Sequence, residues 1–134
     1  MSITEQMLET YPGSTTGVDR ARLRACIDAC AACAEACDAC ADACLSERSA
    51  ADLTTCVRLN LDCAEVCEAT RRVLTRQTGS DARVLRAVLE ACAKVSAVCR
   101  AECEEHAAQH AHCRICAREC QICEQACRDL MSTL

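Results

Sequence analysis

The sequence has almost no aromatic residues: among 134 residues there is one tyrosine, Tyr11, and neither tryptophan nor phenylalanine. Because 51% of the residues are hydrophobic, the chain can bury a core, but this core has to consist of small side chains. Proline occurs once, so little interrupts regular structure. The three glycines are isolated from one another, which excludes a glycine-rich loop that would bind phosphate groups.

Basic patches and long apolar runs are also missing. The formal net charge is -5 and the sequence pI is about 5.2, and both values argue against a nucleic-acid partner. Residues 1 to 19 have neither a basic start nor an apolar run, so we expect no secretory signal and no membrane-spanning segment. The expected location is the reducing cytoplasm, without a membrane partner.

Cysteine is abundant, with 17 residues, and its spacing is regular. Between Cys26 and Cys44, six cysteines follow one another at gaps of 4, 3, 4, 3 and 4 residues, with alanines at many positions between them. Alanine is the best helix former, and on a helix these six thiols lie along one face over about 27 Å. Their Cβ atoms are then about 5 to 6 Å apart, which is too far for a disulfide of about 4.5 Å but suits a shared metal ion.

Three further segments repeat the pattern. Residues 50–78 and the segment that starts at residue 80 or 81 each carry three cysteines at gaps of 7 and 4, and residues 113–127 carry a second dense stripe. Thr16 with Asp19, and Ser49 with Asp52, resemble helix start signals, and Gly79 ends the second segment. A turn near residues 108–112 separates the last two segments, because one helix of some 50 residues would leave its thiols in water.

These segments predict an all-α fold: an antiparallel up-down four-helix bundle with a cysteine-lined core over residues 19–134. Residues 1–18 form a separate N-terminal arm with a short helix within residues 2–11. The alternating helix directions give the bundle two different ends. One end is an apolar plug of Leu23, Leu74, Leu85, Leu89, Leu130 and Met131. The other end gathers Cys44, Cys56, Asn60, His106, His110 and Cys113.

A core of cysteine and alanine leaves space along the bundle axis, which indicates that metal ions fill it. Soft thiolates select Cu(I), zinc or iron–sulfur clusters. Zinc bound by four thiolates keeps a charge of -2, which is costly in a dry core, whereas Cu(I) with one thiolate is neutral and accepts two or three sulfurs. We expect Asn60 to be a hydrogen-bonded buried amide and Ser96 to be a small filler. The candidate ligands are Cys26, Cys30, Cys33, Cys37, Cys40, Cys44, Cys56, Cys63, Cys67, Cys92, Cys99, Cys103, Cys113, Cys116, Cys120, Cys123, Cys127, His106, His110 and His112.

The cysteine ladder resembles that of the bacterial copper storage proteins of the cytosolic type, over about residues 19–131. This resemblance implies a non-enzymatic store that buffers cytoplasmic copper and holds many Cu(I) ions in the bundle. It also implies metal entry at one polar end and assembly into a homotetramer, with a copper chaperone as the candidate donor. His106 and His110 stand at the end where exported members carry methionines.

Two alternative functions remain open at this point. One is a zinc or cadmium sink that resembles a helical metallothionein. The other is a thiol oxidoreductase that uses a CxxC pair such as Cys113 and Cys116. The second alternative lacks the βαβ context that usually supports such chemistry.

Overall fold

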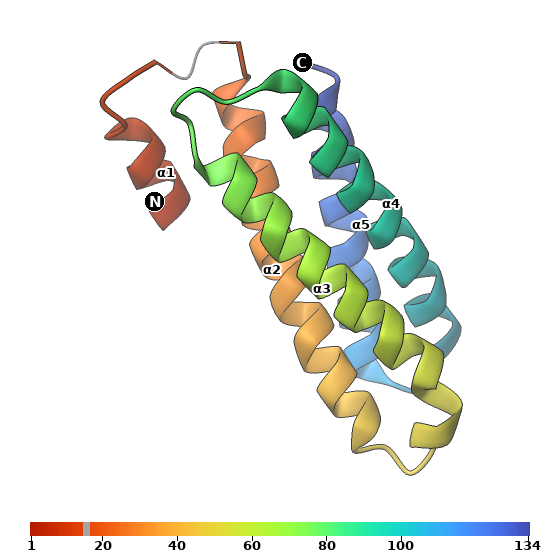
Figure 1. Ribbon diagram of the computed structural model, residues 1–134. Coiled ribbons are helices and arrows are strands. Elements are labelled where there is room, and N and C mark those ends of the chain that lie inside the picture. Colours follow the sequence, from red (N-terminus) through yellow and green to blue (C-terminus); the bar gives the residue numbers. More distant parts are fainter. Residues whose placement is uncertain (15–16) are drawn as a thin grey trace.

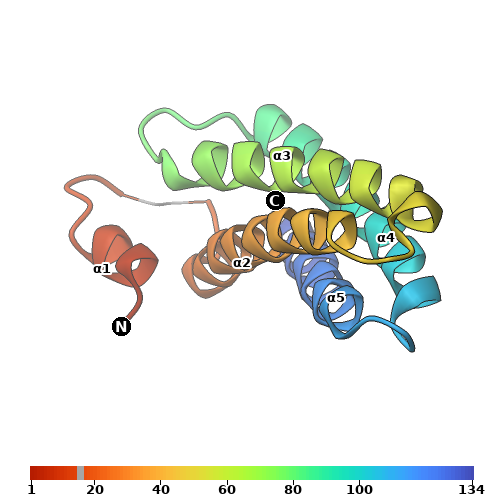
Figure 2. The ribbon, with the colours of Figure 1, turned by 90° about the horizontal axis from the view of Figure 1, so that it is seen from below.

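The computed structural model describes residues 1–14 and 17–134 (Figure 1). Its elements are α1 (Ile3–Glu9), α2 (Arg20–Leu45), a 3-10 helix η1 (Ala50–Leu53), α3 (Thr54–Thr75), α4 (Ala82–His106) and α5 (Ala111–Met131). The helices α2 to α5 run alternately up and down, and each packs against two neighbours around a common axis (Figures 1 and 2). The predicted all-α four-helix bundle is confirmed, and the described ranges contain no strand.

The long helix α2 begins where the Asp19 side chain accepts a hydrogen bond of 2.9 Å from the backbone N–H of Arg22. This cap satisfies one of the free N–H groups of the first turn. The other residue of the predicted start signal, Thr16, lies outside the described residues. At the far end, the backbone N–H of Ser46 donates to the carbonyls of Ala43 and Cys44 and closes the last turn.

The start and the end of α3 differ from the prediction. Ser49 makes no side-chain cap; instead its carbonyl accepts from the N–H of Asp52 at 2.8 Å, so the chain enters α3 through a 3-10 turn. The helix ends at Thr75 and not at Thr78, because Arg76 is extended and the Gln77 side chain donates to the carbonyl of Leu74 at 2.6 Å. Gly79 has a φ of +65°, which is favourable for glycine in the following turn.

The turn between α4 and α5 contains neither glycine nor proline. The helix α4 begins at a cap by Asp81, whose side chain accepts from the N–H of Arg83 at 2.8 Å. At the other end, the N–H groups of Gln109 and His110 both bond to the carbonyl of His106, at 3.2 and 3.0 Å. The predicted hairpin is therefore present, with residues 107–110 between the two helices.

The N-terminal helix α1 lies against the outside of α2 (Figures 1 and 2). Leu8 is buried there, and the Thr4 hydroxyl donates to Asp28 at 2.6 Å. Tyr11 shares a hydrogen bond of 3.0 Å with Thr78. The division of the chain into an arm of residues 1–18 and a bundle of residues 19–134 stays a prediction. In the described part of the chain, every helix is too short or too polar to cross a membrane.

Leucines close the end of the bundle where α2 starts and α5 ends. Leu23, Leu74, Leu89 and Leu130 are fully buried and Leu85 is nearly so, whereas Met131 is only partly buried. Such side chains fill the axis to the density of a normal protein interior. The apolar plug therefore consists of these five leucines, without Met131.

The packing of the apolar plug predicts that two substitutions in α4 differ in their effect on the stability of the protein. Leu89→Ala removes a side chain with 0% exposure, so we expect the free energy of unfolding to fall by about 2 to 5 kcal/mol. Urea denaturation of the reduced protein measures this. Val84→Ala is the matched control, because Val84 is 51% exposed and its loss should change the free energy by less than about 0.5 kcal/mol. Equal effects of the two substitutions would show that the plug is not a packed core.

Candidate metal centre

The thiols of the bundle point to its axis. All seventeen cysteines are free and buried, and they come from all four long helices, as the spacing predicts. We call this set the sulfur core. In α2 it comprises Cys26, Cys30, Cys33, Cys37, Cys40 and Cys44; in α3, Cys56, Cys63 and Cys67; in α4, Cys92, Cys99 and Cys103; and in α5, Cys113, Cys116, Cys120, Cys123 and Cys127.

Sulfur atoms on different helices lie in contact from one end of the core to the other. Each contact is between 3.6 and 3.9 Å. A disulfide bond is about 2.05 Å long, so these sulfurs touch without being bonded. Along α2 the contacts to other helices are Cys26 with Cys127, Cys30 with Cys92, Cys33 with Cys120, Cys37 with Cys116, and Cys40 with Cys113.

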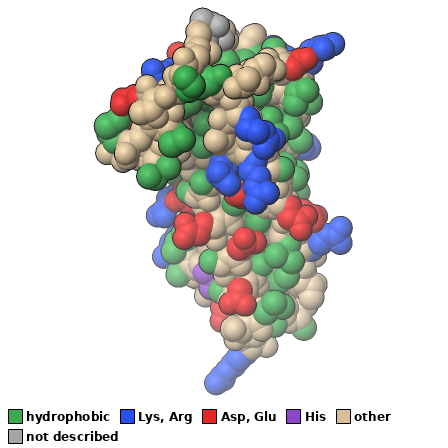
Figure 3. All heavy atoms as spheres, turned by 60° about the vertical axis from the view of Figure 1, so that its left-hand side comes forward, with side chains coloured by type: hydrophobic (Ala, Val, Ile, Leu, Met, Phe, Trp, Pro, Cys, Tyr) green, Lys and Arg blue, Asp and Glu red, His purple; other side chains and the backbone are tan. Residues whose placement is uncertain are grey.

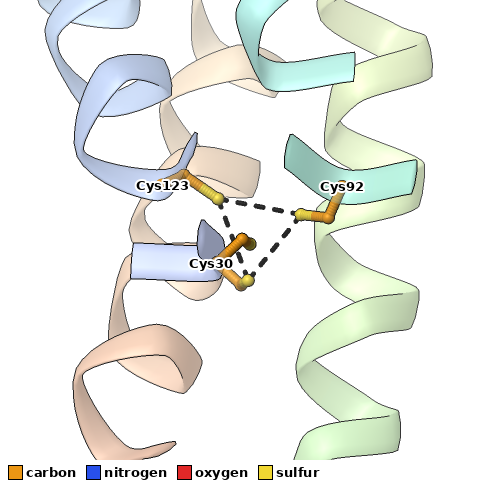
Figure 4. A group of neighbouring side chains, drawn as sticks. Cys30, Cys92 and Cys123 are labelled. Carbon is orange, nitrogen blue, oxygen red and sulfur yellow. Dashed lines mark hydrogen bonds between the residues drawn. The ribbon is translucent and has the colours of Figure 1, made fainter. Parts of the chain in front are cut away.

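Figure 4 shows one such group, in which Cys30 of α2, Cys92 of α4 and Cys123 of α5 point toward one another. Their three sulfur–sulfur distances are 3.9, 3.8 and 3.8 Å. Two metal–thiolate bonds of about 2.3 Å each can span such a gap. The group can therefore bridge metal ions without moving its helices apart.

Similar groups recur along the axis, and in each the sulfur atoms lie within 4.8 Å of one another. Several groups share members: Cys37 and Cys120 belong to two of them, and a group of Cys33, Cys67 and Cys123 links two others. The middle of the core is therefore continuous and does not consist of separate tetrahedral sites. Four of these groups are Cys30, Cys92, Cys123 and Cys127; Cys33, Cys37, Cys63 and Cys120; Cys37, Cys99, Cys116 and Cys120; and Cys40, Cys44, Cys56 and Cys113.

Asn60 is fully buried among the thiols and is hydrogen-bonded on both sides of its amide. Its Oδ1 accepts from Cys99 and Cys116 at 3.1 Å each and from Cys103 at 3.5 Å, and its Nδ2 donates to Cys56 at 3.5 Å. These contacts fit the expectation of a satisfied buried amide. Ser96 lies at 3.9 Å from both Cys63 and Cys67, as a small polar group in the thiol stripe.

The three histidines take different positions at the end opposite the plug. On the side of the molecule drawn in Figure 3, only a small area of histidine reaches the surface. His112 contacts the sulfur core: its Nδ1 lies 3.4 Å from the sulfur of Cys40 and 3.6 Å from that of Cys113. His110 stacks on His112, with ring centroids 5.5 Å apart. His106 pairs with Glu102 on the same helix at 3.4 Å.

Glu47 is a functional candidate that the sequence analysis missed. It lies in the turn between α2 and η1, and its Oε2 pairs with Nδ1 of His110 and, at 3.2 Å, with Nε2 of His112. Glu47 stands outside every cysteine stripe and is 65 positions from His112 in the chain. Only the fold, which places the two turns side by side, reveals this pairing.

Burial changes the acidity of the thiols at this end. Loss of hydration disfavours the charged thiolate and raises the pKa of Cys113 to about 12, and the nearby Cys56 acts in the same direction. Burial also raises the pKa of Cys44. Without metal, Cys113 and Cys44 therefore keep their protons at neutral pH, and metal binding has to displace them. Hydrogen bonds from Cys103 and Cys40 instead lower the pKa of Cys56 at the same end.

Comparisons with known proteins agree with this geometry. Residues 19–132 match the family model described as "Copper storage protein". A structure of the copper storage protein Ccsp from Streptomyces lividans, loaded with 10 copper equivalents, is 56% identical, with a TM-score of 0.96 and coverage of 98% of this chain and 99% of that one.

Two further solved structures are similar. One, described as a cytosolic copper storage protein from Streptomyces lividans with five coppers, is 57% identical, with a TM-score of 0.83 and coverage of 84% of this chain and 94% of that one. The other is Cu(I)-bound BsCsp3 from Bacillus subtilis. It is 34% identical, with a TM-score of 0.73 and coverage of 82% of this chain and 98% of that one.

The raised pKa of Cys113 predicts a pH dependence of the metal-free protein. Because the folded pKa of about 12 lies above the ordinary value of 9.0, Cys113 contributes stability that is fully present below pH 9 and is lost as the pH rises toward 12. We expect the difference in unfolding free energy between the unsubstituted protein and Cys113→Ala to shrink by roughly 1 kcal/mol between pH 9 and pH 10. Urea denaturation under reducing conditions measures it, and a difference that stays constant would contradict the assigned burial effect.

Proposed function

The chain belongs to the copper storage protein family, and from this membership we propose that it stores copper as Cu(I) along the whole sulfur core, loaded from the end that carries the histidines. The observation that carries the proposal is a connected run of sulfur contacts, at 3.6 to 3.9 Å, that leads from Cys30 to Cys116 through thiols of all four long helices. Cu(I) accepts two or three sulfurs and forms a neutral unit with one thiolate. A continuous array of shared thiols suits this chemistry better than separate four-sulfur zinc sites.

The proposed ligands are the seventeen cysteines of the sulfur core together with His106, His110 and His112. Support for His112 is direct, because its Nδ1 lies next to Cys40 and Cys113. His106 and His110 stand at the same end, next to the turn between α4 and α5, where they can receive ions before the thiols do. The apolar plug supports entry from this end, since its buried leucines offer no ligand.

The burial of the thiols favours storage over catalysis. A thiol oxidoreductase needs an exposed cysteine of low pKa. Hydrogen bonds from Cys103 and other thiols do lower the pKa of Cys116, and burial raises that of Cys113, but both side chains are fully buried and out of reach of a substrate disulfide. The cysteines of this CxxC pair also contact Cys40 and Cys37 on α2, as members of the common array. We therefore propose that the protein has no enzymatic activity.

The cytoplasm is the proposed location, with a copper chaperone as the donor. A similar protein from Streptomyces lividans is described as cytosolic, which supports this. We also propose a homotetramer, as the family resemblance implies. Ile115 and Ile122 lie seven residues apart on one face of α5 and are 45% and 48% exposed, so they offer apolar surface for such an assembly.

The central prediction is the copper capacity. An anaerobic titration of the reduced protein with Cu(I), with bound metal separated by gel filtration, should reach on the order of one ion per thiol, whereas zinc should bind far less. Loading should release protons and raise the unfolding temperature, because copper binds the thiolates of the folded state. A plateau at a few ions, a preference for zinc, or an unchanged unfolding temperature would contradict storage.

Substitutions at two neighbouring buried positions test which side chains bind copper in this titration. Cys63 and Ser96 are both fully buried and lie 3.9 Å apart, but only Cys63 is a proposed ligand. Cys63→Ala should therefore lower the capacity by about one ion. Ser96→Ala should leave the capacity unchanged, and a loss in both variants would point to damage of the fold.

The proposed assembly predicts the mass in solution. Light scattering coupled to gel filtration should give about four times the chain mass of 14.4 kDa, with and without copper. A mass of one chain at micromolar concentration would rule the tetramer out and leave the storage function untouched.

A further inference from the structure

We propose that Glu47 is a positioning residue of the metal-entry end, which fixes the ring protons of His110 and His112 so that each imidazole keeps one nitrogen free for Cu(I). The inference rests on the proposed function, since it concerns how copper reaches the sulfur core. It concerns a residue that carries no sulfur and lies outside all four cysteine stripes.

The geometry places one carboxylate oxygen between two imidazoles. Oε2 of Glu47 pairs with Nδ1 of His110 and lies 3.2 Å from Nε2 of His112. The two rings are stacked, with an angle of 20° between their planes. All three side chains are largely shielded, with exposures of 31% for Glu47, 16% for His110 and 27% for His112.

A carboxylate only accepts hydrogen bonds, so each imidazole nitrogen that faces it has to carry the proton. A neutral imidazole has one proton, and the other ring nitrogen then keeps a free lone pair. His112 is therefore held with its proton on Nε2 by the hydrogen bond to Glu47, and the ion-pair contact of His110 favours its proton on Nδ1. The two neighbouring histidines are held in opposite tautomers by the same oxygen.

The tautomer of His112 decides whether Nδ1, the nitrogen that faces the sulfur core, can bind a metal ion. The free lone pair falls on Nδ1, which lies 3.4 Å from the sulfur of Cys40 and 3.6 Å from that of Cys113. These two cysteines belong to the group that also contains Cys44 and Cys56. With the opposite tautomer, a proton would stand on Nδ1, where a copper ion shared with Cys40 and Cys113 would bind.

Carboxylates that orient metal-binding histidines are a general device, and their removal costs 10- to 100-fold in metal affinity or activity. Here the carboxylate comes from the turn after α2, while both histidines come from the turn and first residues of α5. The backbone bonds of Glu47, to Cys44 and Ala50, do not involve its side chain. Substitutions at this position therefore leave the turn intact.

The first experiment reads the tautomers of the copper-free, reduced, full-length protein by long-range ¹H–¹⁵N NMR of its histidine rings. In the unsubstituted protein we expect Nε2–H for His112 and Nδ1–H for His110. In Glu47→Ala both rings should lose this preference. In Glu47→Gln the amide oxygen can still accept from Nε2 of His112 and face Nδ1 of His110, so the tautomers should be kept. Glu105→Ala, which removes an exposed acid near the same end, should change nothing.

The second experiment measures copper transfer from a Cu(I) chelator to the same four proteins. Glu47→Ala should bind its first ions roughly 10- to 100-fold more weakly, with the total capacity unchanged because the sulfur core is intact. Glu47→Gln should bind close to normally. This rescue separates a hydrogen-bond acceptor from a negative charge that merely attracts cations.

The outcomes are distinguishable. If unsubstituted protein takes up no more than a few copper ions, the storage function itself fails. If storage is normal but Glu47→Ala keeps the tautomers and the affinity for the first ions, only the role of Glu47 is overturned. If Glu47→Gln is as weak as Glu47→Ala, or if both rings are doubly protonated in the unsubstituted protein at pH 7.5, the positioning role is likewise wrong.

Discussion

The structure depends on sulfur atoms that are held in contact across a helix bundle but are not bonded to one another. Cysteine is short, so thiols on facing helices can approach only to 3.6 to 3.9 Å while the backbones keep their packing distance. Thiols four residues apart on one helix reach the same separation, as Cys33 and Cys37 at 3.9 Å and Cys63 and Cys67 at 3.8 Å show, so contacts within and between helices are equivalent. This sulfur–sulfur distance depends on three features of the chain: the seven-residue period, the alanines between the cysteines and the antiparallel order of the helices.

The two ends of the axis differ because the same seam positions carry different side chains. At one end, leucines such as Leu23, Leu89 and Leu130 fill the space and exclude water. At the other end, imidazoles and a carboxylate surround the last thiols, with Nδ1 of His112 against Cys40. Asn60 accepts hydrogen bonds from three thiols on its oxygen and donates to a fourth from its nitrogen, so both sides of this buried amide are paired.

The fold and the membership of the sulfur core could be predicted from the sequence because both depend on periodicity. The spacing of Cys26 to Cys44 places its thiols on one helix face whatever the remaining chain does. The predicted end of α3 at residue 78 was wrong because the helix end depends on one side-chain contact, that of Gln77 with the carbonyl of Leu74. The prediction that Ser49 caps the helix was also wrong, because the chain forms a 3-10 turn there and the Ser49 side chain makes no cap hydrogen bond. Glu47 could not be found, since its pairing with His112 arises from two turns that meet only in three dimensions.

The apolar plug has a consequence for turnover. Cys26 and Cys127 pair next to it, at 3.7 Å, so an ion held there has the whole length of the array between itself and the histidines. If copper enters at the histidine end, as proposed, and the plug closes the other end, an ion cannot leave before those that arrived after it. The last ion to arrive would then be the first to depart. On this proposal, the copper held longest is the least available to the cell, and the ions at the histidine end exchange first.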